Sequence, residues 1–286
     1  MSSMPAPARS TAPRDAVRYG LLGAAGIEVM QARFERHRFA VHAHDTWAVC
    51  AVLHGAKDVS ARDARPAIVG AGQLYALPPG ASHAGRTVGG TACEYAMLYI
   101  PDAEWRARCA MQGVTPDLLA APRSQPAAVA RFAAFAARRL RQPAMAAGGD
   151  GEWSLFCESL LAALSPAAAG PSLPAAAPDP RLRRAADLLH ALGHRNVTLD
   201  ELAREASLSV AEFGRRFTAA YGLSPHRYQL ALRLLAAKRL LLGGGTPPDV
   251  AAATGFADQS HLGRHFKAMF GFTPGAVARR RGAGTF

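Results

Sequence analysis

The C-terminal part of this 286-residue chain contains one sequence pattern twice, at an offset of 49 residues. The segment from Arg215 to Pro225 recurs from Arg264 to Pro274, with matching basic, aromatic, glycine and proline positions. Apolar residues at i, i+4 and i+8 of each copy place them on one buried helix face. These residues are Phe213, Phe217 and Tyr221 in the first copy and Leu262, Phe266 and Phe270 in the second. The glycine suits a helix C-terminus and the proline stops propagation, so the chain must fold two copies of one helical unit.

A shorter helix and a tight turn are predicted before each repeated helix. In the first copy, Thr198 and Glu201 have the spacing of a capping box, and Ser209 is placed to cap the next helix. In the second copy, Asp258 takes the place of Ser209. Two helices joined by a tight turn, the second of them basic, describe a helix-turn-helix.

Residues 181–281 resemble the DNA-binding domain of the AraC/XylS family of transcription regulators. The resemblance rests on the segments LDELAREASLS, RRF, YGLSPHRY, RLLAAKRLL and GFADQSHLGRHFKAMFGFTP, of which the last is the most diagnostic. Ser207 departs from the family, which often has glycine there. In a left-handed conformation, serine costs about 1 kcal/mol. The resemblance implies two recognition helices, joined by a rigid helix at about 225–242, that enter successive major grooves roughly 34 Å apart.

By resemblance, exposed residues of the two recognition helices read bases. They are Ala211, Glu212, Gly214 and Arg215 in the first helix and Gln259, Ser260, His261 and Arg264 in the second. The two arginines are the main candidates, because one guanidinium can bond both O6 and N7 of guanine. Phosphate contacts are expected from Ser209, Arg216, Arg227 and Lys267. The alternative for each basic residue is a solvated surface charge.

The charge distribution supports a polyanionic partner. The net charge is +12, and residues 181–286 carry nine of these surplus positive charges. Such asymmetry favours nucleic acid as the partner, before a membrane surface. The double-stranded DNA implied by the resemblance has this polyanionic character.

The cysteine pattern and the hydropathy of the chain indicate the cellular compartment in which the protein is expected. The four cysteines, Cys50, Cys93, Cys109 and Cys157, contain no CxxC pair, which argues against a disulfide framework and fits a reducing compartment. No stretch approaches about 18 continuous apolar residues, and residues 1–15 lack the apolar region of a signal peptide. We therefore expect a cytoplasmic protein with a disordered leader at 1–15 and no membrane contact.

The N-terminal half resembles a cupin barrel. Residues 16–101 show short apolar runs separated by turn residues, typical of a small sandwich or barrel. His42-Ala43-His44 and the later glycine-proline-glycine motif ending at His83 resemble the two cupin motifs. Metal-binding cupins add a glutamate after the first motif, and the register places Ala48 there. We therefore expect no metal or other cofactor, although a three-histidine site is conceivable.

The barrel mouth is instead expected to bind a small-molecule effector, as in AraC-type regulators. The candidate lining residues are His42, His44, Trp47, Tyr75, His83 and Tyr95. The alternative is that the two larger aromatics, Trp47 and Tyr75, belong to the barrel core and that the histidines make structural hydrogen bonds.

The whole chain is expected to be an α+β protein with a helical extension at 102–165 and a Pro/Ala linker at 166–180 before the all-α domain at 181–286. Within the extension, residues 127–142 and 152–164 have helical periodicity. The second of these helices either mediates dimerisation or packs on its own sheet. The 181–286 domain has no cysteine, so we expect its apolar core alone, without disulfides, to hold it together.

These features predict an effector-controlled, sequence-specific transcription regulator rather than an enzyme. By resemblance it is a homodimer on double-stranded DNA, and it contacts RNA polymerase if it is an activator. One alternative is a metal-dependent cupin enzyme with an incidental DNA-binding tail, which stoichiometric iron or manganese would reveal. A nonspecific architectural DNA binder is the other, and it predicts no loss of sequence preference when Arg264 is replaced.

Overall fold

The structure is a computed structural model that describes residues 15–22, 26–60, 67–116, 122–141, 150–165 and 179–278. The expected leader at 1–15 and the linker at 166–180 lie almost entirely outside the described residues. The strands are β1 (Ala16–Leu22), β2 (Ile27–Phe34), β3 (Arg38–His42), β4 (Trp47–His54), β5 (Ala56–Asp58), β6 (Ile68–Gly70), β7 (Gln73–Leu77), β8 (His83–Val88), β9 (Cys93–Ile100) and β10 (Arg123–Ser124). The helices are α1 (Asp102–Met111), α2 (Pro126–Arg141), α3 (Asp150–Leu164), α4 (Pro180–Leu192), α5 (Leu199–Glu205), α6 (Val210–Tyr221), α7 (Pro225–Leu242), α8 (Pro247–Ala253), α9 (Gln259–Phe270) and α10 (Pro274–Ala278). The α+β fold class is confirmed.

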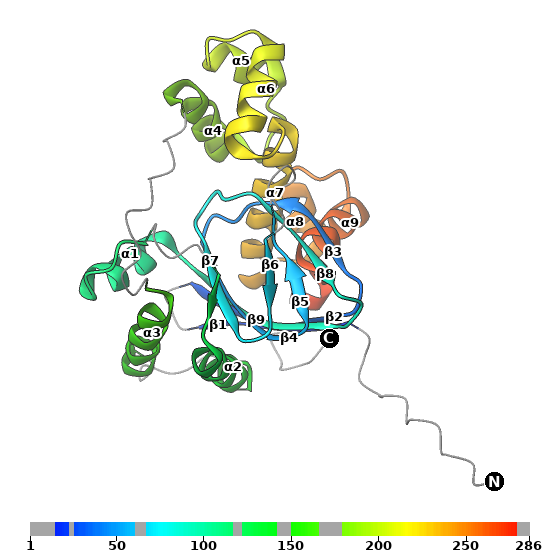
Figure 1. Cartoon of the computed structure of the whole chain (residues 1–286). Coiled ribbons are helices and arrows are strands. Elements are labelled where there is room, and N and C mark those ends of the chain that lie inside the picture. Colours follow the sequence, from blue (N-terminus) through cyan, green and yellow to red (C-terminus); the bar gives the residue numbers. More distant parts are fainter. Residues whose placement is uncertain are drawn as a thin grey trace, which may run out of the picture.

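Two antiparallel sheets form the N-terminal barrel (Figure 1). One has the order β1-β2-β9-β4-β7-β10 and the other β3-β8-β5-β6. Side chains alternate along each strand of the first sheet, as the two-residue period of a strand requires. In β9, for example, Tyr95, Met97 and Tyr99 belong to the barrel-interior cluster, whereas Leu98 and Ile100 pack toward the helices.

Helices α1, α2 and α3 cover the outer face of the larger sheet. Phe132 and Phe135 of α2 are buried against it, and α3 adds Trp153 and Leu160 to the same cluster. The indole of Trp153 donates to Glu104 of α1 at 2.7 Å. One apolar face of α3 therefore packs against α1 and α2, whereas Leu155 of the same helix is exposed, so a role of α3 in dimerisation stays a prediction. No helix within the described segments is long and apolar enough to cross a membrane.

The C-terminal helices form two helix-turn-helix units, α5–α6 and α8–α9, joined by α7. The predicted capping box is present, since Thr198 and Glu201 satisfy each other's backbone N–H groups. Ser209 accepts from the third residue of α6, and Asp258 does the same for α9. Ser207, in the first turn, has φ 53° and is the one non-glycine residue with positive φ in the described chain.

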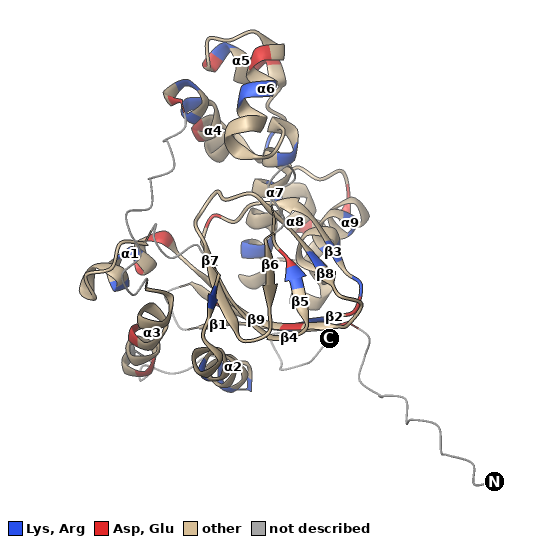
Figure 2. Cartoon of the chain, viewed as in Figure 1, with Lys and Arg blue, Asp and Glu red and all other residues tan. Residues whose placement is uncertain are grey.

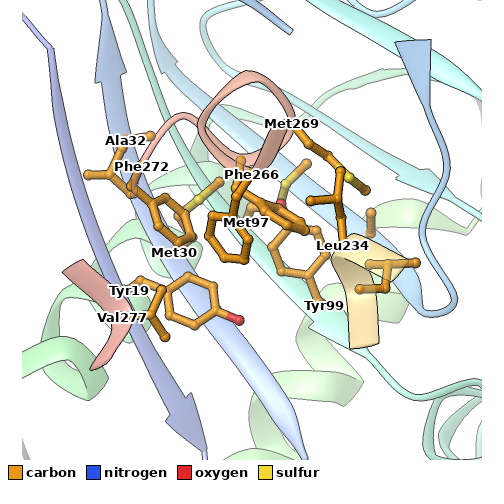
Figure 3. Packing of buried hydrophobic residues seen from close by; sticks show 14 of the residues in the cluster. Tyr19, Met30, Ala32, Met97, Tyr99, Leu234, Phe266, Met269, Phe272 and Val277 are labelled. Carbon is orange, nitrogen blue, oxygen red and sulfur yellow. The ribbon is translucent and has the colours of Figure 1, made fainter. Parts of the chain in front are cut away.

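One hydrophobic core cluster contains residues of both halves, whereas two further clusters lie mainly within one half each. Figure 3 shows Leu234 of α7 and Phe266 and Met269 of α9 packed among Met97 and Tyr99 of the barrel. Figure 1 shows α7 and α9 beside strand β3. The second helix-turn-helix unit thus closes part of the barrel, because apolar residues of each half complete the burial of the other.

Candidate DNA-binding helices and barrel-interior site

The first recognition helix, α6, separates a buried face from an exposed one. Phe213 and Phe217 have no exposed surface, as predicted for core residues. Ala211 and Arg215 are exposed, and Glu212 and Gly214 are half-buried. A Cβ added at Gly214 would meet nothing within 4 Å. The face that bears Arg215 is therefore open to a large partner.

The second recognition helix, α9, repeats this arrangement. Leu262 and Phe266 are fully buried, whereas Gln259, Ser260 and Arg264 are exposed. Within the described chain, no carboxylate lies within ion-pair distance of Arg264 or of its counterpart in α6. An exposed guanidinium without a carboxylate partner keeps its donors available for a nucleic-acid acceptor.

The ring of His261, a predicted base reader, is turned toward its own helix. Its Nε2 lies 3.1 Å from Nε2 of His265, one turn further on, and its ring packs against Phe256. Burial lowers the pKa of His265. The His261 side chain is consequently less accessible than the other predicted base readers of α9.

The four predicted phosphate contacts, Ser209, Arg216, Arg227 and Lys267, are all exposed. Arg216 pairs with Glu212 at 2.7 Å and lies 3.8 Å from Asp179, the N-cap of α4. Glu212 and Arg216 thus hold each other on the surface of α6. Figure 2 shows that basic and acidic residues both occur on α4, α5 and α6.

Three histidines meet in the barrel interior. His42 of β3 is directly opposite His83 of β8, and His44 lies two residues further on the same side. Their ring centroids are 4.4–5.1 Å apart. Burial lowers the pKa of all three histidines, that of His42 to about 4, and the nearby charge of Lys57 lowers each further. All three rings are therefore neutral near pH 7.

Two of the predicted aromatic lining residues lie in the same interior. Nζ of Lys57 is 3.9 Å from the centroid of the Tyr95 ring and 5.9 Å from that of Tyr75. Lys57 is 6% exposed, and the contacts described for its ammonium are with these rings and with no carboxylate. The ring centroid of Tyr99 lies 4.8 Å from that of His44. Neither Tyr99 nor Lys57 was among the residues predicted to line the effector site.

Trp47 was wrongly predicted to line the effector site. Trp47 is the first residue of β4, and its side chain lies on the face of the sheet that points away from the barrel interior. Its ring centroid is 5.9 Å from that of Trp105, and its indole N–H donates a hydrogen bond to Asp102 at 2.8 Å. Ala48, the next residue, faces the barrel interior. The two-residue period of β4 therefore places Trp47 in the helix-facing core, which is the alternative considered for it.

A buried ion pair joins the barrel to the DNA-binding half. Lys238 of α7 pairs with Glu28 of β2, and both side chains are less than a tenth exposed. The ammonium also lies 4.6 Å from the centroid of the Tyr99 ring. Sequence carried a signal for this residue, since Lys238 falls between Leu234 and Leu241 on the apolar side of α7.

A cleft of about 300 Å³ lies where the barrel meets α4 and α7. Its walls include His44 and Asp45 from the barrel and Tyr221, Tyr228 and Leu235 from the helices. One member of the histidine cluster therefore borders both the barrel interior and the contact between the two halves.

The C-caps of both recognition helices touch the barrel near this cluster. Gly222 ends α6 with φ 67°, and a Cβ there would lie 1.9 Å from Oγ of Ser82, the neighbour of His83. Gly271 ends α9 with φ 82°, and a Cβ there would lie 2.6 Å from Cζ of Phe34. Both positions require glycine for the turn and for the close approach.

Fold and site together define a helix-turn-helix DNA-binding regulator with a barrel of the ligand-binding type. A family model for the AraC-like ligand binding domain matches residues 24–165, and one for a helix-turn-helix domain matches residues 202–280. The chain belongs to the AraC family of transcription regulators.

Sequence relatives agree with this assignment. The chain is 35% identical over 85 residues to the uncharacterized HTH-type transcriptional regulator YbfI of Bacillus subtilis, and 34% identical over 87 residues to the regulator MtrA of Neisseria gonorrhoeae. These matches cover 30% and 29% of this chain and 31% and 28% of the relatives. The chain thus spans less than a third of the length of these curated relatives.

The two-domain fold is also found in ToxT of Vibrio cholerae. Its crystal structure matches with a TM-score of 0.58 and 10% identity, over 92% of this chain and 96% of ToxT. Another ToxT structure, with a TM-score of 0.54, contains a bound unsaturated fatty acid. Because the sequences are only 10% identical, this similarity establishes a shared fold alone.

Proposed function

We propose that this chain is a sequence-specific transcription regulator of the cytoplasm whose affinity for DNA is set by a small molecule bound in the barrel. The observation that carries the DNA-binding part is the duplicated exposed face with Arg215 and Arg264 at matching positions. As a homodimer the protein would contact two half-sites, and as an activator it would also contact RNA polymerase.

The shared core supports control by an effector. The barrel interior, with its histidines and Tyr75 and Tyr95, is continuous with residues of α7 and α9. A molecule that enters this interior acts on both halves, and it shifts the equilibrium between arrangements by its difference in affinity for them. The fatty acid bound by ToxT, a protein of the same fold, supports a small organic effector.

The experiment is a binding assay on the DNA that flanks the gene for this chain, located first by footprinting. We expect Arg264→Ala to cost roughly 1–3 kcal/mol at one base pair and to relax the preference there. Arg215→Ala should do the same at a second base pair about one helical turn away.

Arg227→Ala is the matched control, because an exposed arginine that contacts phosphate adds affinity without sequence information. It should weaken binding evenly across sequences and reduce the salt dependence by about one unit of slope. Unchanged base preference in both Arg215→Ala and Arg264→Ala would contradict sequence-specific reading by these helices.

A further inference from the structure

We infer that His42, His44 and His83 form a binding site for a divalent first-row transition ion such as Zn²⁺, with coordination positions left open for an effector. This goes beyond the proposed function, which requires only an organic ligand. The three imidazoles each offer one nitrogen, and these nitrogens all lie within 4.8 Å of one another. A tetrahedral ion with nitrogen ligands at 2.0–2.1 Å needs separations of about 3.4 Å, so small side-chain rotations complete the site.

The hydrogen bonds of two rings fix the orientation that a metal ligand needs. Nδ1 of His42 lies 2.7 Å from the carbonyl oxygen of Ala40, and Nδ1 of His83 lies 3.1 Å from that of Ala81. A carbonyl only accepts, so Nδ1 carries the proton and Nε2 keeps its lone pair. Metal-bound histidines make this outer bond almost always.

The third ring has a buried nitrogen without a partner. Nδ1 of His44 is inaccessible to solvent and has no hydrogen-bond partner in the described chain, although buried polar atoms rarely lack one. His44 is 4% exposed and lies between His83 and Tyr99. A structural role for the cluster accounts for the bonds of His42 and His83 but leaves this nitrogen unexplained. A shared ion accounts for all three rings.

The surrounding charges determine what completes the coordination. Lys238 is balanced by Glu28, whereas Lys57 has only aromatic rings as described partners. Ala48 occupies the position at which metal-binding cupins carry a carboxylate. Three neutral imidazoles thus do not neutralise the charge of the ion, and the ammonium of Lys57 adds a further positive charge nearby. An anionic oxygen from a ligand would offset both positive charges. The site should therefore bind metal more tightly when a carboxylate is present.

The test titrates chelator-treated full-length protein with Co²⁺, whose visible absorption reports ligation by the protein, and with Zn²⁺ as competitor. We expect one equivalent of Co²⁺ to bind, Zn²⁺ to displace it, and added acetate to tighten binding. His83→Ala and His42→Ala should each weaken binding by more than the 10–100-fold typical for loss of an outer-shell partner. Tryptophan fluorescence verifies folding, since Trp47, Trp105 and Trp153 all belong to the barrel and the helices that cover it.

Two variants control for binding elsewhere. His54→Ala removes an exposed histidine of β4, and His265→Ala removes one of the paired imidazoles on α9. Both should keep the full Co²⁺ signal. A signal lost in His265→Ala but kept in His83→Ala, or no Co²⁺ absorption in the wild-type protein, would overturn the inference. Operator binding is measured separately, so a failed metal titration leaves the proposed regulatory function standing.

Discussion

Lys238 and Glu28 form an ion pair that is buried at the contact between α7 and β2. Removing both charges from water carries a large desolvation cost, so such a pair adds little net stability. Losing one partner is different, because the other charge remains buried without compensation. The pair therefore makes the contact between the two halves sensitive to any change in either side chain.

We predict that Glu28→Gln and Lys238→Met each lower the free energy of unfolding by about 3–5 kcal/mol. The double variant should lose much less than the sum, because it leaves no unpaired buried charge. Urea denaturation measures all three. Arg239→Met is the control. The side chain of Arg239, which pairs with Asp45, is 61% exposed, so losing this ion pair should lower the free energy of unfolding by about 1 kcal/mol or less. Additive losses in the double variant would contradict the coupling.

The positions of individual residues were predictable where a repeat or motif marked them. The repeat predicted that Arg215 and Arg264 are exposed, and the structure agrees. The cupin-like motif pointed to the three histidines that the structure brings together, and the roles of all these residues stay predictions. Trp47 was misplaced because a one-residue difference along β4 changes the face of the sheet. Lys57 lies on the short strand β5, whose three residues are too few to show alternation. Its burial depends on the packing of both sheets.

At the scale of elements, the two helix-turn-helix units differ in their turns. The second turn contains Gly255 with φ 76°, whereas the first has Ser207 with φ 53°. A side chain with a Cβ is strained in this left-handed region, and glycine is not. The sequence showed Ser207 where the family often has glycine, and the structure confirms that this residue has a left-handed conformation.

Ser207→Gly should therefore stabilise the protein by about 0.5–1 kcal/mol, since the relief of strain exceeds the extra entropy of glycine in the unfolded chain. Ser207→Ala keeps the Cβ and should change stability by less than about 0.5 kcal/mol. Thermal unfolding of the two variants side by side makes the measurement. Destabilisation by glycine would mean that the serine side chain itself supports the turn.

Helix ends were the best predicted elements, because capping is local chemistry. Thr198, Ser209 and Asp258 each accept the backbone hydrogen bond expected from their spacing. The docking of α9 against β3 was not predictable in this way. It joins residues far apart in the chain through apolar contacts that have no sequence period of their own.

For the whole molecule, we expect the core cluster that both halves share to couple their unfolding. Tryptophan fluorescence reports the N-terminal half, and far-UV circular dichroism reports mainly the helices, most of which lie in the C-terminal half. We predict that the two signals change at the same denaturant concentration, as in a two-state transition. Leu234→Asp should separate the two transitions, because it places a charge in the shared core.

Leu240→Asp is the matched control on the same helix. Leu240 is 44% exposed, whereas Leu234 is 3% exposed, so only the latter substitution should uncouple the halves. Two separate transitions in the wild-type protein would show that the contact between barrel and helices contributes little to stability.

The glycine C-caps have a consequence for operator architecture. Both candidate recognition helices, α6 and α9, end against the barrel wall, one beside the loop that leads into β8 and the other against β2 and β3. Their separation is therefore set by the sensor as well as by the connecting helix α7. A movement of one barrel strand relative to another would change the distance between α6 and α9. The two helices would then no longer match the spacing of successive major grooves. For the proposed regulator, we therefore expect that exchanging the barrel for that of a relative changes which half-site spacings the protein accepts.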